Sequence, residues 1–341
     1  MRRVAIGDLH NDLLADVLHA EERGRPDRFS CYWLPQLRAG AVSLCVLAVF
    51  TEEQFAGEGA LRRCLRTLDL AHRIAAEHAD EVVLVSDRGA LAGAPGAGRI
   101  ELLLALEGLE PVGADLSLLR VLRRLGVTIA SLTWNRRTAM ADGAGESATG
   151  GGLTALGVEA VSEMERLGML VDVSHLSDAG FWHVAEIATR PLVATHSSCR
   201  ALVDHVRNLD DRQLADVAAT GGVVGVNLFG GFLGPGGGVE QALRHLEHVV
   251  EVAGADHVGI GADFMADLLE CTDPILGGSL VAGAVGSLLK PDLLRPADLA
   301  ELGDAVAEHF GEVVARKICL QNARRVLAGC SQVEGQERTR G

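Results

Sequence analysis

The sequence predicts an α/β fold, a single-domain (β/α)8 TIM barrel with additional helices near its C-terminal end. Short apolar segments rich in β-forming residues alternate with longer segments of helical periodicity, which is the pattern of βα units around a parallel sheet. The 341 residues are 48% hydrophobic and include 41 glycines. This composition suits one large core with many tight turns between strands and helices.

Eight segments are predicted to be strands, and eight parallel strands close a barrel of this kind. They are residues 4–8, 42–49, 100–106, 127–132, 170–173, 192–195, 223–227 and 258–261. An open doubly wound sheet is the alternative, but it requires a glycine-rich phosphate loop after its first strand. The first strand here ends instead in Asp8-Leu9-His10-Asn11-Asp12, which has the appearance of a metal-binding loop.

Helices are predicted between these strands, and several carry start or stop signals. They cover residues 53–78, 116–124, 157–167, 177–187, 210–220 and 239–252, followed by a C-terminal pair near 296–327. Asp210 and Asp211 place acids where the helix dipole favours them, and Gly221 and Gly222 can adopt the left-handed conformation that ends a helix. We assign residues 1–330 to the barrel and expect the polar tail at 331–341 to be disordered.

Charge and hydropathy exclude several classes of partner. The formal net charge is −15, and the arginines are interleaved with acids, so we expect no binding to nucleic acid. The first apolar run is too short for a signal peptide, which predicts a cytoplasmic protein. The apolar segment at 277–289 is too short and glycine-rich to span a bilayer, so no membrane association is expected. Seven scattered cysteines without a Cys-x-x-Cys motif indicate reduced thiols.

Candidate metal ligands fall just past the C-terminal ends of predicted strands, where barrel enzymes build their active sites. His10 and Asp12 are two residues apart, so both side chains can point to the same side, although such a pair can also arise by chance or as a cap. Glu107 follows five apolar residues, and an ionised glutamate there needs a metal ion or an arginine as its partner.

Two further histidines and one aspartate complete the set. His175 and His196 end successive predicted strands, and Asp263 follows the eighth strand, which neighbours the first in a closed barrel. Three histidines and three carboxylates are enough for two divalent ions that share a carboxylate and a hydroxide. Nitrogen and oxygen ligands favour two Zn²⁺ per chain, with Mn²⁺ or Co²⁺ as substitutes.

A set of short motifs runs along the chain. They are His10-Asn11-Asp12, Glu107-Gly108, Leu132-Thr133-Trp134-Asn135, Gly152-Leu153-Thr154, Met169-Leu170-Val171-Asp172-Val173-Ser174-His175, Thr195-His196-Ser197-Ser198, Arg207-Asn208 and Gly259-Ile260-Gly261-Ala262-Asp263-Phe264. In order and spacing, this set resembles the membrane dipeptidase (renal dipeptidase) family, peptidase family M19, within the metal-dependent hydrolase superfamily.

The resemblance implies a role for each matched residue. His10 and Asp12 would bind one zinc, His175 and His196 the other, and Glu107 would bridge them. Asp263 would be the catalytic acid and base. Arg207 would hold the terminal carboxylate of the substrate, although a surface salt bridge with Asp210 or Asp211 is the alternative.

The chain departs from the family pattern near the substrate. Mammalian relatives carry a histidine where this chain has Trp134, so Trp134 would form an apolar wall or Asn135 would donate a hydrogen bond to the substrate. The segment Phe229-Gly230-Gly231-Phe232 is expected to be a glycine-rich loop that shapes the side-chain pocket.

We therefore predict hydrolysis of dipeptides by a metal-bridging hydroxide, with tolerance of a C-terminal D-residue implied by the family. One alternative is a different amide at the same site, such as an N-acyl amino acid, a β-lactam or a pathway-specific conjugate. Another is a metal-binding partner protein without turnover, which would have no need of Asp263. Relatives are often dimers, so a homodimer is one expected state.

Overall fold

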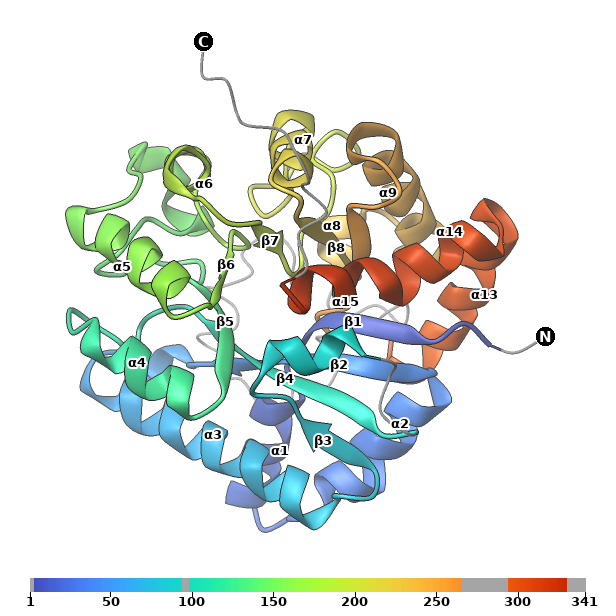
Figure 1. Ribbon diagram of the computed structural model, residues 1–341, viewed down its shortest axis with the longest axis horizontal. Helices are drawn as coiled ribbons and strands as arrows, with labels where there is room; N and C mark the ends of the chain where they lie inside the picture. The colour runs from blue at the N-terminus through green and yellow to red at the C-terminus, as the bar shows by residue number, and fades with distance from the viewer. Residues whose placement is uncertain (1–2, 94–97, 265–293, 330–341) are drawn as a thin grey trace.

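The computed structural model describes residues 3–93, 98–264 and 294–329, and at its centre is a closed barrel of eight parallel strands (Figure 1). The strands follow one another around the barrel in chain order, except that β2 pairs directly with β4, and β9 closes the ring by pairing with β1. The strands are β1 (Ile6–Asn11), β2 (Val42–Phe50), β3 (Val82–Leu84), β4 (Ile100–Glu107), β5 (Val127–Ser131), β6 (Leu170–Asp172), β7 (Val193–Ala194), β8 (Val223–Asn227) and β9 (Val258–Gly261). The predicted barrel is confirmed.

Two details of the strands differ from the prediction. The extra strand β3 lies outside the ring, because it pairs with the first three residues of β4 while β5 pairs with β4 from Leu104 onward. Three residues are too few to show a periodicity in sequence. Strand β1 also continues through His10 to Asn11, with a register shift after Asp8, so His10 lies within the strand rather than in the loop that follows it.

Helices surround the strands (Figure 1). They are α1 (Leu13–Glu22), α2 (Leu34–Ala39), α3 (Glu58–Glu77), α4 (Ser117–Arg124), α5 (Ala155–Arg166), α6 (Asp178–Ile187), α7 (Asp211–Ala219), α8 (Gly230–Leu233), α9 (Gly238–Ala253), α13 (Leu299–Phe310), α14 (Glu312–Arg316) and α15 (Asn322–Leu327). Helix α3 begins five residues later than predicted, after Gly57 with its positive φ of 74°. Helix α7 carries both predicted signals: Asp210 forms a capping box, and Gly221 has a φ of 82°.

Three short helices were not predicted, namely α1, α2 and α8. The expected glycine-rich loop at Phe229 to Phe232 is wrong, because α8 occupies it from Gly230. Two adjacent glycines give this segment a low helix propensity. Burial of Phe232 and Leu233 stabilises the turn in the folded protein, and that packing is invisible in the sequence.

The barrel interior positions the functional residues. Alternate residues of β4 face opposite sides, with Leu103 and Ala105 in the interior cluster and Leu104 packed in the outer core with the helices. Glu107 has the same parity as the interior residues, so its side chain enters the barrel at the carboxyl ends of the strands. Apolar residues of α15, including Leu327, close the interior at the opposite end.

The remaining predictions about organisation concern the membrane and the tail. No helix in the described ranges is long and apolar enough to cross a bilayer. The segments at 277–289 and 331–341 lie outside the described residues. The cysteines in the described part of the chain, Cys31, Cys45, Cys64, Cys199 and Cys319, are all free thiols.

Candidate active site

The predicted metal ligands meet at the carboxyl end of the barrel, together with the predicted acid and base. All six side chains are buried, and they are His10, Asp12, Glu107, His175, His196 and Asp263. The ligand atoms of His10, Glu107 and His196 lie within 4.8 Å of one another, and so do those of His10, Asp12 and Asp263. Five different strands deliver these six residues to one place.

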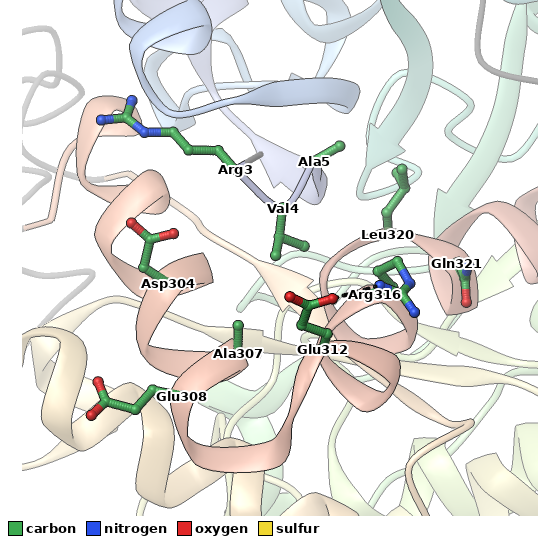
Figure 2. Close-up of a pocket in the computed structure, with 10 residues that line it drawn as sticks. All are labelled: Arg3, Val4, Ala5, Asp304, Ala307, Glu308, Glu312, Arg316, Leu320 and Gln321. Carbon is green, nitrogen blue, oxygen red and sulfur yellow. Dashed lines mark hydrogen bonds and ion pairs between the residues drawn. The ribbon is translucent and has the colours of Figure 1, made fainter. Parts of the chain in front are cut away.

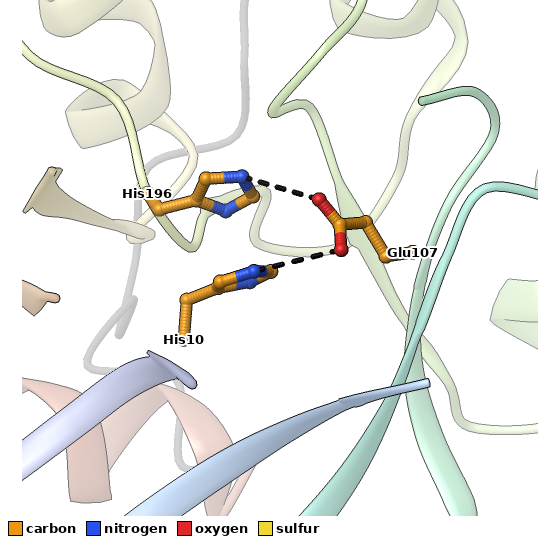
Figure 3. A group of neighbouring side chains, drawn as sticks. All are labelled: His10, Glu107 and His196. Carbon is orange, nitrogen blue, oxygen red and sulfur yellow. Dashed lines mark ion pairs between the residues drawn. The ribbon is translucent and has the colours of Figure 1, made fainter. Parts of the chain in front are cut away.

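The two carboxylate oxygens of Glu107 face different side chains, His10 and His196 (Figure 3). We call His10 and Asp12 the first pair, and their Nε2 and Oδ2 atoms are 3.5 Å apart. His175 and His196 are the second pair. Oε2 of Glu107 is 3.7 Å from His10 Nε2. Oε1 is 2.9 Å from His175 Nε2 and 3.7 Å from His196 Nε2. One oxygen of Glu107 therefore faces each pair, as a bridging carboxylate would.

The backbone around the second pair is unusually close-packed. A Cβ atom at either Gly225 or Gly261 would overlap the carbonyl oxygen of Thr195, so only glycine in β8 and β9 allows His196 to sit where it does. His175 and Asp263 have positive φ values of 70° and 51°. Such conformations cost on the order of 1 kcal/mol or more in a residue with a Cβ, and they concentrate at functional sites.

Hydrogen bonds fix the outer nitrogens of the second pair. Nδ1 of His175 is 2.8 Å from Asn135 Oδ1, and Nδ1 of His196 is 2.8 Å from the Thr195 hydroxyl. Burial holds the pKa of both imidazoles well below the ordinary value, so both are neutral. With the proton on Nδ1, each Nε2 presents a lone pair, yet the two Nε2 atoms are only 2.7 Å apart. A metal cation satisfies two converging lone pairs, so the second pair fits a metal ion.

The first pair also fits a metal ion. His10 Nε2 and Asp12 Oδ1 are buried and have no hydrogen-bond partner among the residues described. Burial lowers the pKa of His10, but the carboxylates of Glu107 and Asp12 outweigh it and raise the pKa to about 10. Burial raises the pKa of Glu107, while positive charge on His10 opposes this. Carboxylates packed this closely require positive charge, and a divalent ion with nitrogen and oxygen ligands supplies it.

Asp263, the predicted acid and base, lies beside the first pair. Its Oδ2 accepts a hydrogen bond of 2.7 Å from Asn227 Nδ2, and its backbone N–H donates to the His10 carbonyl oxygen. Burial raises the pKa of Asp263 to about 6, with His10 and the Asn227 hydrogen bond opposing the rise and Asp12 adding to it. A buried carboxyl group beside the candidate ligands, with its Oδ1 free of the Asn227 bond, suits general acid and base catalysis.

Arg207 belongs to this site. Its side chain is buried, its Nη2 donates to the His196 carbonyl oxygen at 3.3 Å, and its Nε has no hydrogen-bond partner within the described ranges. The alternative of a salt bridge with Asp210 or Asp211 is wrong, because Asp210 caps α7 and Asp211 pairs with a histidine of α9. Burial lowers the pKa of Arg207, whereas Asp263 and Glu107 raise it. The guanidinium is thus available to an anion.

Trp134 lies beside the second pair. Its ring centroid is 5.9 Å from that of His175 and 5.3 Å from that of Phe50. The indole is half-buried, so it presents an apolar face next to the candidate metal ligands. An apolar wall formed by Trp134 against the substrate stays a prediction.

Two of the predicted substrate contacts also contact other protein side chains. Oδ1 of Asn135 is 2.8 Å from Nδ1 of His175, and the expected donation to the substrate would use the Nδ2 group of the same amide. Phe229 is buried and packs edge-to-face against Phe232. The ring centroid of Phe232 lies 5.6 Å from Cζ of Arg207. A substrate contact by Phe229 stays a prediction.

Sequence reasoning missed the polar residues that support the ligands. Asp8 is buried and accepts hydrogen bonds from the backbone N–H groups of His10 and Ala262, which joins β1 to β9. Asp172, Thr195 and Asn227 act similarly on other strands. The signal that could have revealed the two aspartates and the asparagine is a polar side chain inside or ending an apolar strand, since such a group must find a partner.

A separate cavity lies at the other end of the barrel (Figure 2). It has a volume of about 960 Å³ and is bounded by Val4, which precedes β1, and by residues of α13 and α14. Arg316 and Glu312, which line it, form an ion pair with each other. None of the predicted site residues lines this cavity, so it is distinct from the candidate active site.

Curated relatives match part of the chain. An uncharacterised dipeptidase of Schizosaccharomyces pombe is 35% identical over 213 residues, covering 60% of this chain and 51% of the relative. The dipeptidase verJ of Clonostachys rogersoniana is 34% identical over 206 residues, covering 60% and 53%. The chain thus matches about half the length of these relatives.

Solved structures match nearly all of it. A structure described as the dipeptidase AC, a metallopeptidase of family M19, has a TM-score of 0.81 at 27% identity and covers 97% of this chain and 99% of its own. A metallopeptidase from Rhodobacter sphaeroides, liganded with a phosphinate mimic of the dipeptide L-Ala-D-Ala, has a TM-score of 0.80 at 26% identity, with coverages of 96% and 99%. The family model of the membrane dipeptidases matches residues 1–272. This chain therefore belongs to the membrane dipeptidase family, peptidase family M19.

Proposed function

We propose that this protein is a binuclear zinc dipeptidase that hydrolyses the amide bond of dipeptides. The observation that carries the proposal is the convergence of five metal-ligating side chains with Asp263 and Arg207 at the carboxyl end of the barrel. Membership of the family supports the same chemistry. A metal-binding protein without turnover would not need Asp263, a further buried carboxyl group beside the ligands that Asn227 holds in place.

Each pair would hold one ion. His10 and Asp12 would ligate the first and His175 and His196 the second, with one oxygen of Glu107 for each. When bound, two such ions activate a water molecule and polarise the scissile carbonyl group. The ligand set of imidazoles and carboxylates favours zinc, and Mn²⁺ or Co²⁺ would be accepted.

Asp263 would move the proton. As a carboxylate it takes a proton from the attacking water, and as an acid it returns that proton to the amine that leaves. The hydrogen bond from Asn227 occupies Oδ2 and so leaves Oδ1 for the transfer. The backbone bond to the His10 carbonyl oxygen holds Asp263 against the first pair throughout.

Arg207 and Trp134 would select the substrate. A buried guanidinium with an N–H group still free can bind the C-terminal carboxylate of a dipeptide, and burial makes that ion pair strong. Trp134 would form an apolar wall beside the scissile bond. The Rhodobacter sphaeroides relative holds a mimic of L-Ala-D-Ala, which supports tolerance of a D-residue at the C-terminal position.

The test is amine release from matched L,L and L,D dipeptides by zinc-loaded protein, with chelator-treated protein and Asp263→Asn as controls. N-acyl amino acids and a β-lactam are assayed in parallel. We expect cleavage of dipeptides that is sensitive to chelator, with the L,D series also accepted. Protein that holds two zinc ions but cleaves only an N-acyl amino acid or the β-lactam would replace the dipeptide with another amide. A cytoplasmic location and a homodimer remain predictions.

A further inference from the structure

The Nδ1 atoms of the two histidines in the second pair have different hydrogen-bond partners. Asn135 contacts His175 through one hydrogen bond, whereas His196 is held by a chain of two residues. In that chain the Thr195 hydroxyl lies between His196 Nδ1, at 2.8 Å, and the carboxylate of Asp172. We call Asp172 and Thr195 the relay. All three residues are buried, so water does not compete for these bonds.

The direction of the hydrogen bonds in the relay is determined by chemistry. Oδ1 of Asp172 accepts the backbone N–H groups of Ser174 at 2.9 Å and Thr195 at 3.0 Å, and Oδ2 accepts the Thr195 hydroxyl. A carboxylate only accepts, so the hydroxyl proton points to Asp172. The Thr195 oxygen is then an acceptor toward His196, and Nδ1 of His196 must carry the proton.

This tautomer leaves Nε2 of His196 as a lone pair aimed at Glu107 and His175. In the first pair, by contrast, two atoms that could bind a metal, His10 Nε2 and Asp12 Oδ1, have no hydrogen-bond partner among the described residues. The second pair is therefore oriented by the protein, and outer-sphere partners of this kind tune how tightly a histidine binds a metal.

We propose that Asp172 and Thr195 are positioning residues that set the tautomer of His196 and thereby the affinity of the second metal position alone. The inference rests on the proposed function, because it takes His175 and His196 to be ligands. It predicts that the two metal positions respond differently to changes in the relay.

The first variant is Thr195→Val, which keeps the shape of the side chain and removes the hydroxyl. Metal-stripped full-length protein is titrated with Zn²⁺ against a chromophoric chelator, and Co²⁺ binding is followed by visible absorption. Wild type should bind two ions. The valine variant should lose about 10- to 100-fold in affinity for one ion and keep the other, and Thr195→Ser should restore it.

The second variant, Asp172→Asn, reverses the direction of the hydrogen bonds through the Thr195 hydroxyl. In Asp172→Asn the amide oxygen can still accept the two backbone N–H groups, so the amide nitrogen faces the Thr195 oxygen and donates to it. The hydroxyl proton then turns to His196 Nδ1 and moves the ring proton to Nε2. Imidazole ¹⁵N shifts of ion-free protein should report that change for His196, while those of His10 stay as in wild type.

Thr128→Val is the matched control, because Thr128 is equally buried in β5 and its hydroxyl contacts only the Leu104 carbonyl oxygen among the bonds found. It should lower thermal stability without changing either metal affinity. Equal affinities for both ions in Thr195→Val and wild type would overturn the relay and leave the proposed function standing. Wild-type protein that binds no divalent ion would overturn both. An unchanged His196 tautomer in Asp172→Asn would also overturn the relay.

Discussion

The two pairs of candidate ligands both face Glu107, yet they differ in their hydrogen-bond partners. The second pair, His175 and His196, has its outer nitrogens hydrogen-bonded to Asn135 and Thr195. The first pair, His10 and Asp12, keeps unpartnered ligand atoms in a buried setting and lies beside Asp263. One side of the site is thus oriented by hydrogen bonds from neighbouring segments, and the other side places Asp263, the proposed proton-transfer group, beside the candidate ligands.

The two pairs, and the residues that support them, come from different strands of the barrel. Strands β6 and β7 carry the second pair together with the Asp172 that orients it. Strands β1 and β9 carry the first pair together with Asp263, and Asp8 joins them through the backbone of Ala262. Changes to Asp172 or Thr195 should therefore alter binding of the second ion, whereas changes to Asp263 should alter turnover.

The largest effect is expected from Asp263→Asn. Turnover of a dipeptide should fall roughly 100- to 10,000-fold, because the amide cannot accept the proton of the attacking water. Metal content, measured by elemental analysis, should stay at the wild-type value. Unchanged turnover would remove Asp263 from the mechanism, and loss of an ion would make it a ligand of the first pair.

The next effect concerns the residue between the pairs. Glu107→Gln should lower the affinity for both ions by at least about 100-fold, because each oxygen of Glu107 faces one pair. His10→Ala should lower mainly the affinity for the first ion, and His196→Ala mainly the affinity for the second. Zinc titration of the three variants tests this division. If Glu107→Gln lost only one ion, the bridging arrangement would be wrong.

A smaller effect is expected at the substrate end. Arg207→Lys keeps a positive charge but loses the planar fork that matches a carboxylate. We expect kcat/KM for dipeptides to fall about 10- to 100-fold, mostly through KM, with both ions retained. Steady-state kinetics on a dipeptide and on its C-terminal amide provide the measurement. An equal loss on both substrates would show that Arg207 does not read the carboxylate.

The smallest effect is a shift with pH. Burial raises the pKa of Asp263 to about 6 in the ion-free protein. Nearby cations favour the carboxylate, so ion binding should bring this pKa back down, below 6. Activity should therefore hold above pH 6 and fall about tenfold per unit only below that lowered pKa, as Asp263 takes up its proton. Asn227→Ala should move this acid limb to higher pH, because the lost hydrogen bond favours the carboxylate. A wild-type limb above pH 6, at constant metal content, would contradict the assignment.

Much of the fold and the ligand set was predictable because both leave local traces. Apolar runs of strand length alternate with helical periodicity, and His175 or Glu107 at the end of such a run stands out as a polar group that needs a partner. Strand β3 and helix α8 left no such trace. One is too short for a period, and the other is helical in spite of two glycines because Phe232 and Leu233 pack against the rest of the molecule.

The barrel, the family motifs and the residue types that gather at one end of the strands can all be predicted from the sequence. The contacts that those residues make with one another depend on the tertiary structure. It turned Asn135 toward His175, put Phe232 near Arg207, and joined Asp172 to His196 through Thr195. The physical reason is that strand periodicity is a local property, whereas a hydrogen bond across β6 and β7 depends on register and close approach. Those are set by packing between segments far apart in the chain.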